Sequence, residues 1–149
     1  MNESVQQYWN EFWKGKEPPK LSVTAEQFGY DAIADELAQL IIDGKKTATC
    51  SAYALYEIGN EPLPATDKYT IVLNNQNQPV GIIKITDVII IRMNEVSNEL
   101  ALAEGGLTFE YWWDEHKLAF TEDLAGVGLE FSEDMLLVFE RFEVIDVKK

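Results

Sequence analysis

The chain has 149 residues, 46% of them hydrophobic, which suits one compact domain with a core that needs no disulfide. Its 26 acidic residues against 12 basic ones give a net charge of -14, which disfavours diffuse binding to duplex DNA but leaves room for a small basic pocket. The single cysteine, Cys50, excludes a disulfide within the chain, and the first residues lack a signal-peptide pattern, so a cytoplasmic protein is expected. The longest apolar run, Val88 to Ile91, is too short to span a bilayer, and no membrane partner is expected.

The first third of the chain carries two predicted helices. Ser4 is the expected start of the first helix, which ends at Gly15. Its apolar residues recur at helical spacing and form an aromatic face: Val5, Tyr8, Trp9, Phe12 and Trp13. This face either covers the rest of the domain or forms the surface of a homodimer, and the sequence leaves both open. A second helix is predicted over residues 31–43, with Gly44 as its C-terminal cap.

Strands dominate the rest of the prediction, with helices inserted between them. β-Branched and aromatic residues predict a strand over residues 47–58, and a hairpin is predicted from strands 69–73 and 80–91. Helices are predicted over residues 95–104 and from Thr108 to about Phe120, followed by a last strand over residues 135–147. The fold class that follows from this order is α+β.

The junction IIDGKKTATCS places two lysines between the second helix and the next strand. A lysine three residues before a threonine can reach it across a tight turn. Lys46 can then take a proton from the Thr49 hydroxyl, or hold a carbonyl or anionic group of a ligand. The alternative is structural, because lysines near a helix C-terminus interact favourably with the dipole, and Thr and Ser alternate on the solvent face of strands.

The second half of the chain adds further candidates, each with a structural alternative. Glu104 stands before two glycines at a predicted helix end, where it either projects into a cleft or is an ordinary exposed acid. The Trp112–Trp113 pair either stacks a base or belongs to the core. His116, the only histidine, can in principle act as base for Cys50, although no spacing rule connects them and a buried cysteine is the default.

Several kinds of site are not expected. One cysteine and one histidine cannot make a structural zinc site, and the acids lack the spacing of a calcium loop, so no metal is expected. Neither GxGxxG nor a GxxxxGK phosphate loop occurs. No GxSxG elbow supports a serine hydrolase.

The stretch FGYDAIADELAQLIIDGKKTATCS resembles the ASCH-domain family of the PUA-like superfamily, whose hallmark GxKxxT is matched by Gly44, Lys46 and Thr49. The resemblance is to the longer bacterial members and extends from about Phe28 through NEPLPATDKYTIVLNNQNQPVGIIKITDV, ALAEGGLTFEYWWDEHKLAF and LLVFERFEVI. It implies a PUA-like twisted β-barrel with surrounding helices. We expect a single domain over residues 1–149, with the helix and linker of residues 1–20 packed on it.

Small members of this family are amidohydrolases that remove the acetyl group from N4-acetylcytidine, and the resemblance assigns their catalytic residues to Lys46, Thr49 and Glu104. It also implies a cleft that takes RNA or a small nucleoside-like ligand. No cofactor is expected. The ligand-binding residues expected on this basis are Gly44, Lys45, Ser51, Trp112 and His116.

Two positions depart from the family pattern. Ser51 stands where the small amidohydrolases carry an arginine, and Trp113 stands where many relatives have one. The loss of positive charge favours a nucleoside over RNA. Two hypotheses follow. The first is an amidohydrolase in which Lys46 is the base, Thr49 the nucleophile, and Glu104 orients the lysine or protonates the leaving amine. The second is a non-catalytic module that binds RNA or a nucleotide in the same cleft.

Overall fold

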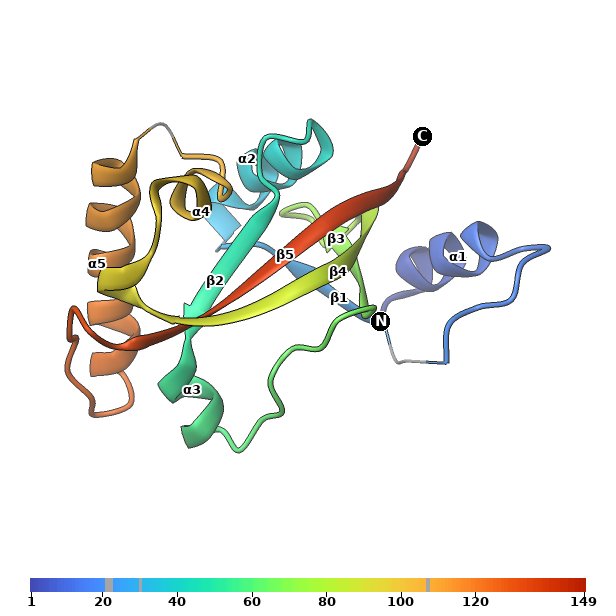
Figure 1. The fold of residues 1–149 in the computed structure, drawn as a ribbon. Coiled ribbons are helices and arrows are strands. Elements are labelled where there is room, and N and C mark those ends of the chain that lie inside the picture. Colours follow the sequence, from blue (N-terminus) through green and yellow to red (C-terminus); the bar gives the residue numbers. More distant parts are fainter. Residues whose placement is uncertain (21–22, 30, 107) are drawn as a thin grey trace. The chain divides into compact units, whose positions relative to one another are not determined.

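The computed structural model describes residues 1–20, 23–29, 31–106 and 108–149. The chain forms two compact units, each assembled from separate segments. The first unit contains Met1–Lys45, Ala65–Thr86 and Phe142–Lys149, and the second contains Lys46–Pro64 and Asp87–Arg141. Two long strands, β4 (Pro79–Arg92) and β5 (Leu136–Val147), contribute residues to both units. Figure 1 labels the elements along the chain.

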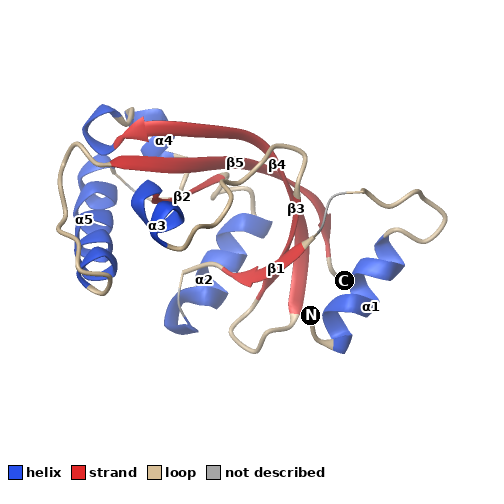
Figure 2. Ribbon diagram, turned by 90° about the horizontal axis from the view of Figure 1, so that it is seen from below, coloured by secondary structure: helices blue, strands red, loops and turns tan. Residues whose placement is uncertain are grey.

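The strands form one mixed sheet in the order β1-β3-β4-β5-β2. The short strands are β1 (Thr24–Gln27), β2 (Ala48–Ala52) and β3 (Tyr69–Leu73). β1 pairs with β3 in parallel, whereas β3 with β4 and β2 with β5 are antiparallel. Figure 2 shows these strands in red together with the helices in blue. The predicted α+β class is confirmed.

In the first unit, apolar residues of β3 alternate between two hydrophobic clusters, because successive side chains of a strand point to opposite faces. Ile71 lies in a cluster with Trp9 of α1 (Glu3–Phe12), and Val72 lies in another with Ile41 of α2 (Asp31–Ile42). The aromatic face of α1 is therefore buried within its own unit. Asn2, rather than the predicted Ser4, caps this helix by accepting a hydrogen bond from the Val5 N–H at 2.9 Å.

The second unit packs its helices on β2 and on the parts of β4 and β5 that belong to it. The helices are α3 (Tyr53–Ile58), the 3-10 turn η1 (Met93–Glu95), α4 (Asn98–Leu102) and α5 (Phe109–Ala125). Its core contains Trp112 of α5, Phe139 of β5 and Met93, all nearly inaccessible to solvent. Within the described ranges, no helix has both the length and the apolar character needed to cross a membrane.

Several local predictions are confirmed, among them the second helix, the hairpin of β3 and β4, the last strand and the Thr108 cap of α5. The strand predicted over residues 47–58 is wrong beyond Ala52, where the chain turns into α3. This segment contains Ala, Leu and Glu, which favour a helix. The helix predicted over residues 95–104 is shorter and spans Asn98–Leu102. It begins later because the Ser97 hydroxyl caps α4 by accepting a hydrogen bond from the Leu100 N–H.

Candidate functional site

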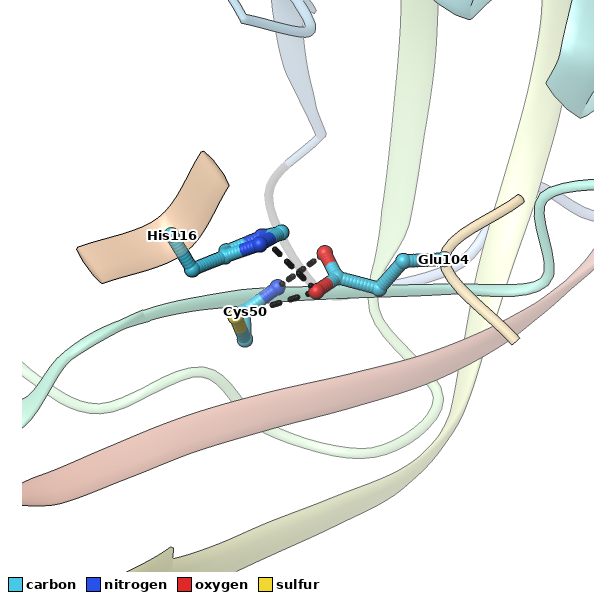
Figure 3. Close-up of side chains that lie close together, drawn as sticks. All are labelled: Cys50, Glu104 and His116. Carbon is cyan, nitrogen blue, oxygen red and sulfur yellow. Dashed lines mark hydrogen bonds and ion pairs between the residues drawn. The ribbon is translucent and has the colours of Figure 1, made fainter. Parts of the chain in front are cut away.

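A buried carboxylate, that of Glu104, lies at the centre of the second unit's polar cluster. Glu104 follows α4 and is only 8% exposed to solvent. The positive φ of Gly105, 91°, turns the chain directly afterwards, which glycine adopts without strain. The side chain is directed toward β2 and α5, where Cys50 and His116 face it (Figure 3). The sequence alternative of an ordinary exposed acid is therefore wrong.

One carboxylate oxygen, Oε1, completes the open edge of β2, which is the last strand of the sheet. It accepts a hydrogen bond from the Cys50 backbone N–H at 3.1 Å. The neighbouring Ala103 carbonyl accepts from the backbone N–H groups of Thr47 and Ala48 at 2.7 and 3.0 Å. The turn after α4 thus supplies the acceptors that a further strand would otherwise provide.

The other oxygen, Oε2, faces side-chain donors from β2 and α5. It lies 2.9 Å from His116 Nε2 and 3.2 Å from the Cys50 thiol, and it also accepts a hydrogen bond from the Trp112 indole N–H. Trp112 and His116 are four residues apart on α5 and therefore share one face of the helix. His116 Nδ1 donates to the Trp112 carbonyl at 2.8 Å. Both ring nitrogens face acceptors, an arrangement that favours the protonated form of His116.

Lys46 completes the cluster from the segment before β2. The residue is 4% exposed, and its Nζ donates to the Ala48 carbonyl at 2.8 Å and lies 3.5 Å from Glu104 Oε1. This ion pair joins residues 58 positions apart in the sequence. A buried charge is tolerated only when it is paired and hydrogen-bonded, which both partners are here.

Burial and the neighbouring charges shift the pKa values of Glu104, His116 and Cys50. Burial alone would raise the pKa of Glu104, but the hydrogen bond from His116 and the charge of Lys46 lower it to about 2. Burial alone would lower the pKa of His116, but the hydrogen bond and charge of Glu104 raise it. Burial, together with the Glu104 charge, raises the pKa of the Cys50 thiol well above its usual range. These directions favour a carboxylate at Glu104, an imidazolium at His116 and a neutral thiol at Cys50.

Of the catalytic residues expected from the sequence, the structure brings Lys46 and Glu104 together. Thr49 lies in β2 between Ala48 and Cys50, whose side chains belong to the core cluster, and strand alternation directs Thr49 to the other face. No described residue forms a hydrogen bond with the Thr49 hydroxyl. The thiol of Cys50 is protonated and contacts Glu104, which does not favour the Cys50–His116 nucleophile and base pair.

The expected ligand-binding residues are distributed unevenly. His116 and Trp112 contact Glu104, but Trp112 is 2% exposed and stacks against His116 and Phe139, so it is a core residue. Ser51 shares a hydrogen bond of 2.8 Å with the Tyr56 hydroxyl. Gly44 and Lys45 belong to the first unit. Two surface hollows of that unit, along α1 and beside the 74–80 hairpin, are lined by other residues than this cluster.

Gly44 has a structural role at the end of α2. Its φ is 75°, and a Cβ built there would meet nothing within 4 Å, so only backbone strain opposes a larger residue. We expect Gly44→Ala to lower the free energy of unfolding by about 1 kcal/mol, measured by urea denaturation. The matched control is Gly126→Ala, since Gly126 has a negative φ of -62° at the end of α5 and a Cβ there would make only ordinary contacts, the nearest at 3.4 Å. An unchanged stability for Gly44→Ala would contradict the strain argument.

Comparison with known proteins defines the class of protein. The family model of the ASCH domain matches residues 24–146. The ASCH domain of Lactobacillus crispatus has a similar structure, with a TM-score of 0.91 and 30% identity over 98% of this chain and 96% of its own. The chain belongs to the ASCH domain family, which confirms the resemblance and the PUA-like fold expected from it.

A second solved structure is still more similar in sequence. The protein EF3133 of Enterococcus faecalis is 40% identical, with a TM-score of 0.89 over 99% of this chain and 91% of its own. The hypothetical protein PH0355 shares the fold at 14% identity, with a TM-score of 0.52 over 83% of this chain and 97% of its own. Among curated proteins, none matches the chain.

Proposed function

We propose that this chain hydrolyses the exocyclic amide of an N4-acylated cytidine or a similar modified pyrimidine nucleoside. The observation that carries the proposal is the buried ion pair between Lys46 and Glu104. Thr49 follows Lys46 by three positions, in the strand whose edge Glu104 completes. Lys46 and Glu104, two of the three residues to which the family resemblance assigns catalysis, share one location, whereas the third, Thr49, lies on the other face of β2.

The proposed reaction requires Lys46 to release its own proton to solvent and the Thr49 hydroxyl to approach Lys46 Nζ, after which Lys46 accepts the proton of that hydroxyl. The Thr49 oxygen forms a bond to the acyl carbon, and the bond between that carbon and the N4 nitrogen breaks. The proton passes from Lys46 to the leaving nitrogen, which departs as the free cytidine amine. Water then hydrolyses the acyl ester of Thr49, which releases the carboxylic acid and restores the hydroxyl.

Glu104 acts in this proposal as a positioning residue. Its pKa is lowered to about 2, so the carboxyl group is ionised at neutral pH and carries no proton for the leaving amine. Both oxygens already accept hydrogen bonds, from Cys50 on one side and from Trp112 on the other. Of the two roles that the sequence left open for Glu104, orientation of Lys46 is the one that fits these contacts.

The test is a screen of N4-acetylcytidine and related acylated nucleosides, followed by chromatography of the nucleoside and assay of the released acid. We expect turnover by the wild-type chain and a fall in kcat/KM of about 100-fold or more for Thr49→Val, which removes the nucleophile while keeping a β-branched shape. Thr47→Val is the matched control, because Thr47 is exposed and precedes the strand.

Two results would contradict the proposal. One is the absence of acid release by the wild-type chain from every acylated cytidine. The other is an equal rate for the wild type and Thr49→Val, with Thr49→Val folded by circular dichroism, which would remove the proposed nucleophile. Retained turnover by Thr47→Val shows that a loss in Thr49→Val comes from the missing Thr49 hydroxyl and not from a general disturbance of β2.

A non-catalytic module for a nucleotide or RNA is the second candidate. It is favoured by one observation, namely that the Thr49 hydroxyl has no contact with Lys46 or Glu104 among the described residues. A module that binds RNA shows affinity that falls steeply with salt. A tRNA titration at low and moderate salt separates the candidates, because tight, salt-sensitive binding without turnover supports the module.

A further inference from the structure

We propose that Cys50, Glu104 and His116 form a binding site for a divalent transition-metal ion of the Zn²⁺ type. The inference is independent of the amidohydrolase, because it rests on ligand atoms alone. A thiol sulfur, a carboxylate oxygen and an imidazole nitrogen from these residues all lie within 4.8 Å of one another. Figure 3 shows the side chains of Cys50 and His116 approaching the Glu104 carboxylate. These are the ligand types that zinc takes in proteins.

The spacing of the atoms fits a small tetrahedral ion. Cys50 Sγ lies 3.2 Å and His116 Nε2 lies 2.9 Å from Glu104 Oε2. A tetrahedral zinc ion with ordinary bond lengths separates sulfur from oxygen by about 3.6 Å and nitrogen from oxygen by about 3.4 Å. Cys50 Sγ and His116 Nε2 therefore each need to move away from Oε2 by only about half an ångström, and, since all three ligand atoms lie within 4.8 Å of one another, a small turn of the His116 or Cys50 side chain brings sulfur and nitrogen to the separation of about 3.6 Å that the ion needs. The fourth position is left for water or a ligand.

Contacts around the three ligands orient them as protein metal ligands are usually oriented. His116 Nδ1 donates to the Trp112 carbonyl at 2.8 Å, which leaves Nε2 as the ring nitrogen facing the site. The Glu104 carboxylate is fixed by the Cys50 N–H on Oε1 and by the Trp112 indole on Oε2. Such hydrogen bonds hold each ligand in place before an ion arrives.

The ligands bind a metal ion only in their deprotonated forms. An ion therefore takes Cys50 as the thiolate and His116 through an unprotonated Nε2, and any protons on these atoms are released to solvent. Lys46 remains beside Oε1, on the oxygen that the ion does not take. The His116 side chain is 25% exposed, against 6% for Glu104, which provides a route of entry from solvent.

The sequence did not indicate this site, because its residues follow no known ligand spacing. Cys50 and Glu104 are 54 positions apart, and they meet only through the packing of the turn after α4 on the edge of β2. Structural zinc sites read from sequence rely on paired cysteines and histidines at short spacing, which this chain lacks.

The test is a titration of the tag-free, chelator-treated chain with Co²⁺, a spectroscopic substitute for Zn²⁺. We expect saturation at one ion per chain, visible bands of tetrahedral Co²⁺, a sulfur-to-cobalt charge-transfer band in the near ultraviolet, and loss of all these bands on addition of Zn²⁺. Cys50→Ala should remove the charge-transfer band and weaken binding by about tenfold or more. His116→Gln should weaken binding by a similar factor.

Two further variants make the outcome specific. Glu115→Gln changes an exposed acid next to His116 on α5 and should bind Co²⁺ like the wild type. Thr49→Val should also bind normally, so that failure of the proposed hydrolase and failure of the metal site are distinguishable. The proposal is overturned if the wild type shows no saturable binding, or if Cys50→Ala, folded by circular dichroism, keeps the same spectrum and affinity.

Discussion

Replacement of Glu104 by alanine is expected to lower the free energy of unfolding by about 3–5 kcal/mol. The substitution leaves Lys46 buried without its counter-ion and removes the acceptor for the Cys50 N–H and the Trp112 indole. A pKa lowered from 4.5 to about 2 corresponds by itself to about 3 kcal/mol, which agrees with that range. Urea denaturation of the chelator-treated chain at neutral pH measures the effect.

Two matched variants separate the causes of this loss. Glu104→Gln keeps the shape and one acceptor but removes the charge, and we expect a smaller loss of about 1–3 kcal/mol. Glu122→Ala changes an exposed acid on α5 and should alter stability by less than about 0.5 kcal/mol. A loss for Glu104→Ala no larger than that for Glu122→Ala would contradict the structural account of the cluster.

The same carboxyl group gives the stability a defined pH dependence. Since the pKa of Glu104 is lower in the folded state than the ordinary value of 4.5, its contribution is fully present above pH 4.5 and is lost as the pH falls toward 2. The difference in unfolding free energy between wild type and Glu104→Gln should therefore shrink below pH 4.5. A difference that stays constant between pH 7 and pH 3 would argue against the lowered pKa.

The second large effect is expected at Trp112. Its side chain is 2% exposed and lies 4.7 Å from His116 and 6.1 Å from Phe139, measured between ring centroids. Trp112→Ala should lower the unfolding free energy by about 3–5 kcal/mol, because it empties the centre of the core. Trp112→Phe keeps a ring but loses the indole donor to Glu104, and we expect a loss of about 1–3 kcal/mol.

A neighbouring residue provides the control for Trp112. Trp113 is only partly buried and stacks with Phe109, so Trp113→Phe should change stability by less than about 1 kcal/mol. Thermal unfolding followed by far-ultraviolet circular dichroism compares all of these variants. Equal losses for Trp112→Phe and Trp112→Ala would mean that the hydrogen bond to Glu104, rather than the packing of the ring, dominates at this position.

Features with a local cause could be predicted from the sequence. The hairpin of β3 and β4 was predictable because a polar stretch separates two β-prone runs. The start of α5 was predictable because threonine is a preferred N-cap residue, and Thr108 caps this helix. The helix α3 was missed because a mainly apolar segment of only six residues is compatible with either a strand or a helix. The strand β1 was missed because four residues in parallel pairing depend on β3, which is distant in the sequence.

The site was predictable only in part, because it too depends on contacts between segments that are distant in the sequence. The motif suggested Lys46, Thr49 and Glu104, but the burial of Glu104 depends on how the turn after α4 meets β2. In a chain with 26 acidic residues, composition could not distinguish this carboxylate from an exposed one. The contact of Cys50 with Glu104 has only a weak local signal, namely its position between Ala48 and Ala52 on the inward face of the strand.

The turn after α4 also bears on how molecules of this protein behave toward one another. An exposed outer strand offers unpaired N–H and C=O groups to which an extended segment of a second molecule can add, a common origin of fibrils. Here the Ala103 carbonyl and the Glu104 carboxylate already occupy the N–H groups of Thr47, Ala48 and Cys50. Loss of that carboxylate would free one of these groups, so Glu104 variants should aggregate more readily than equally destabilised variants of the hydrophobic cluster that contains Trp9 and Ile71.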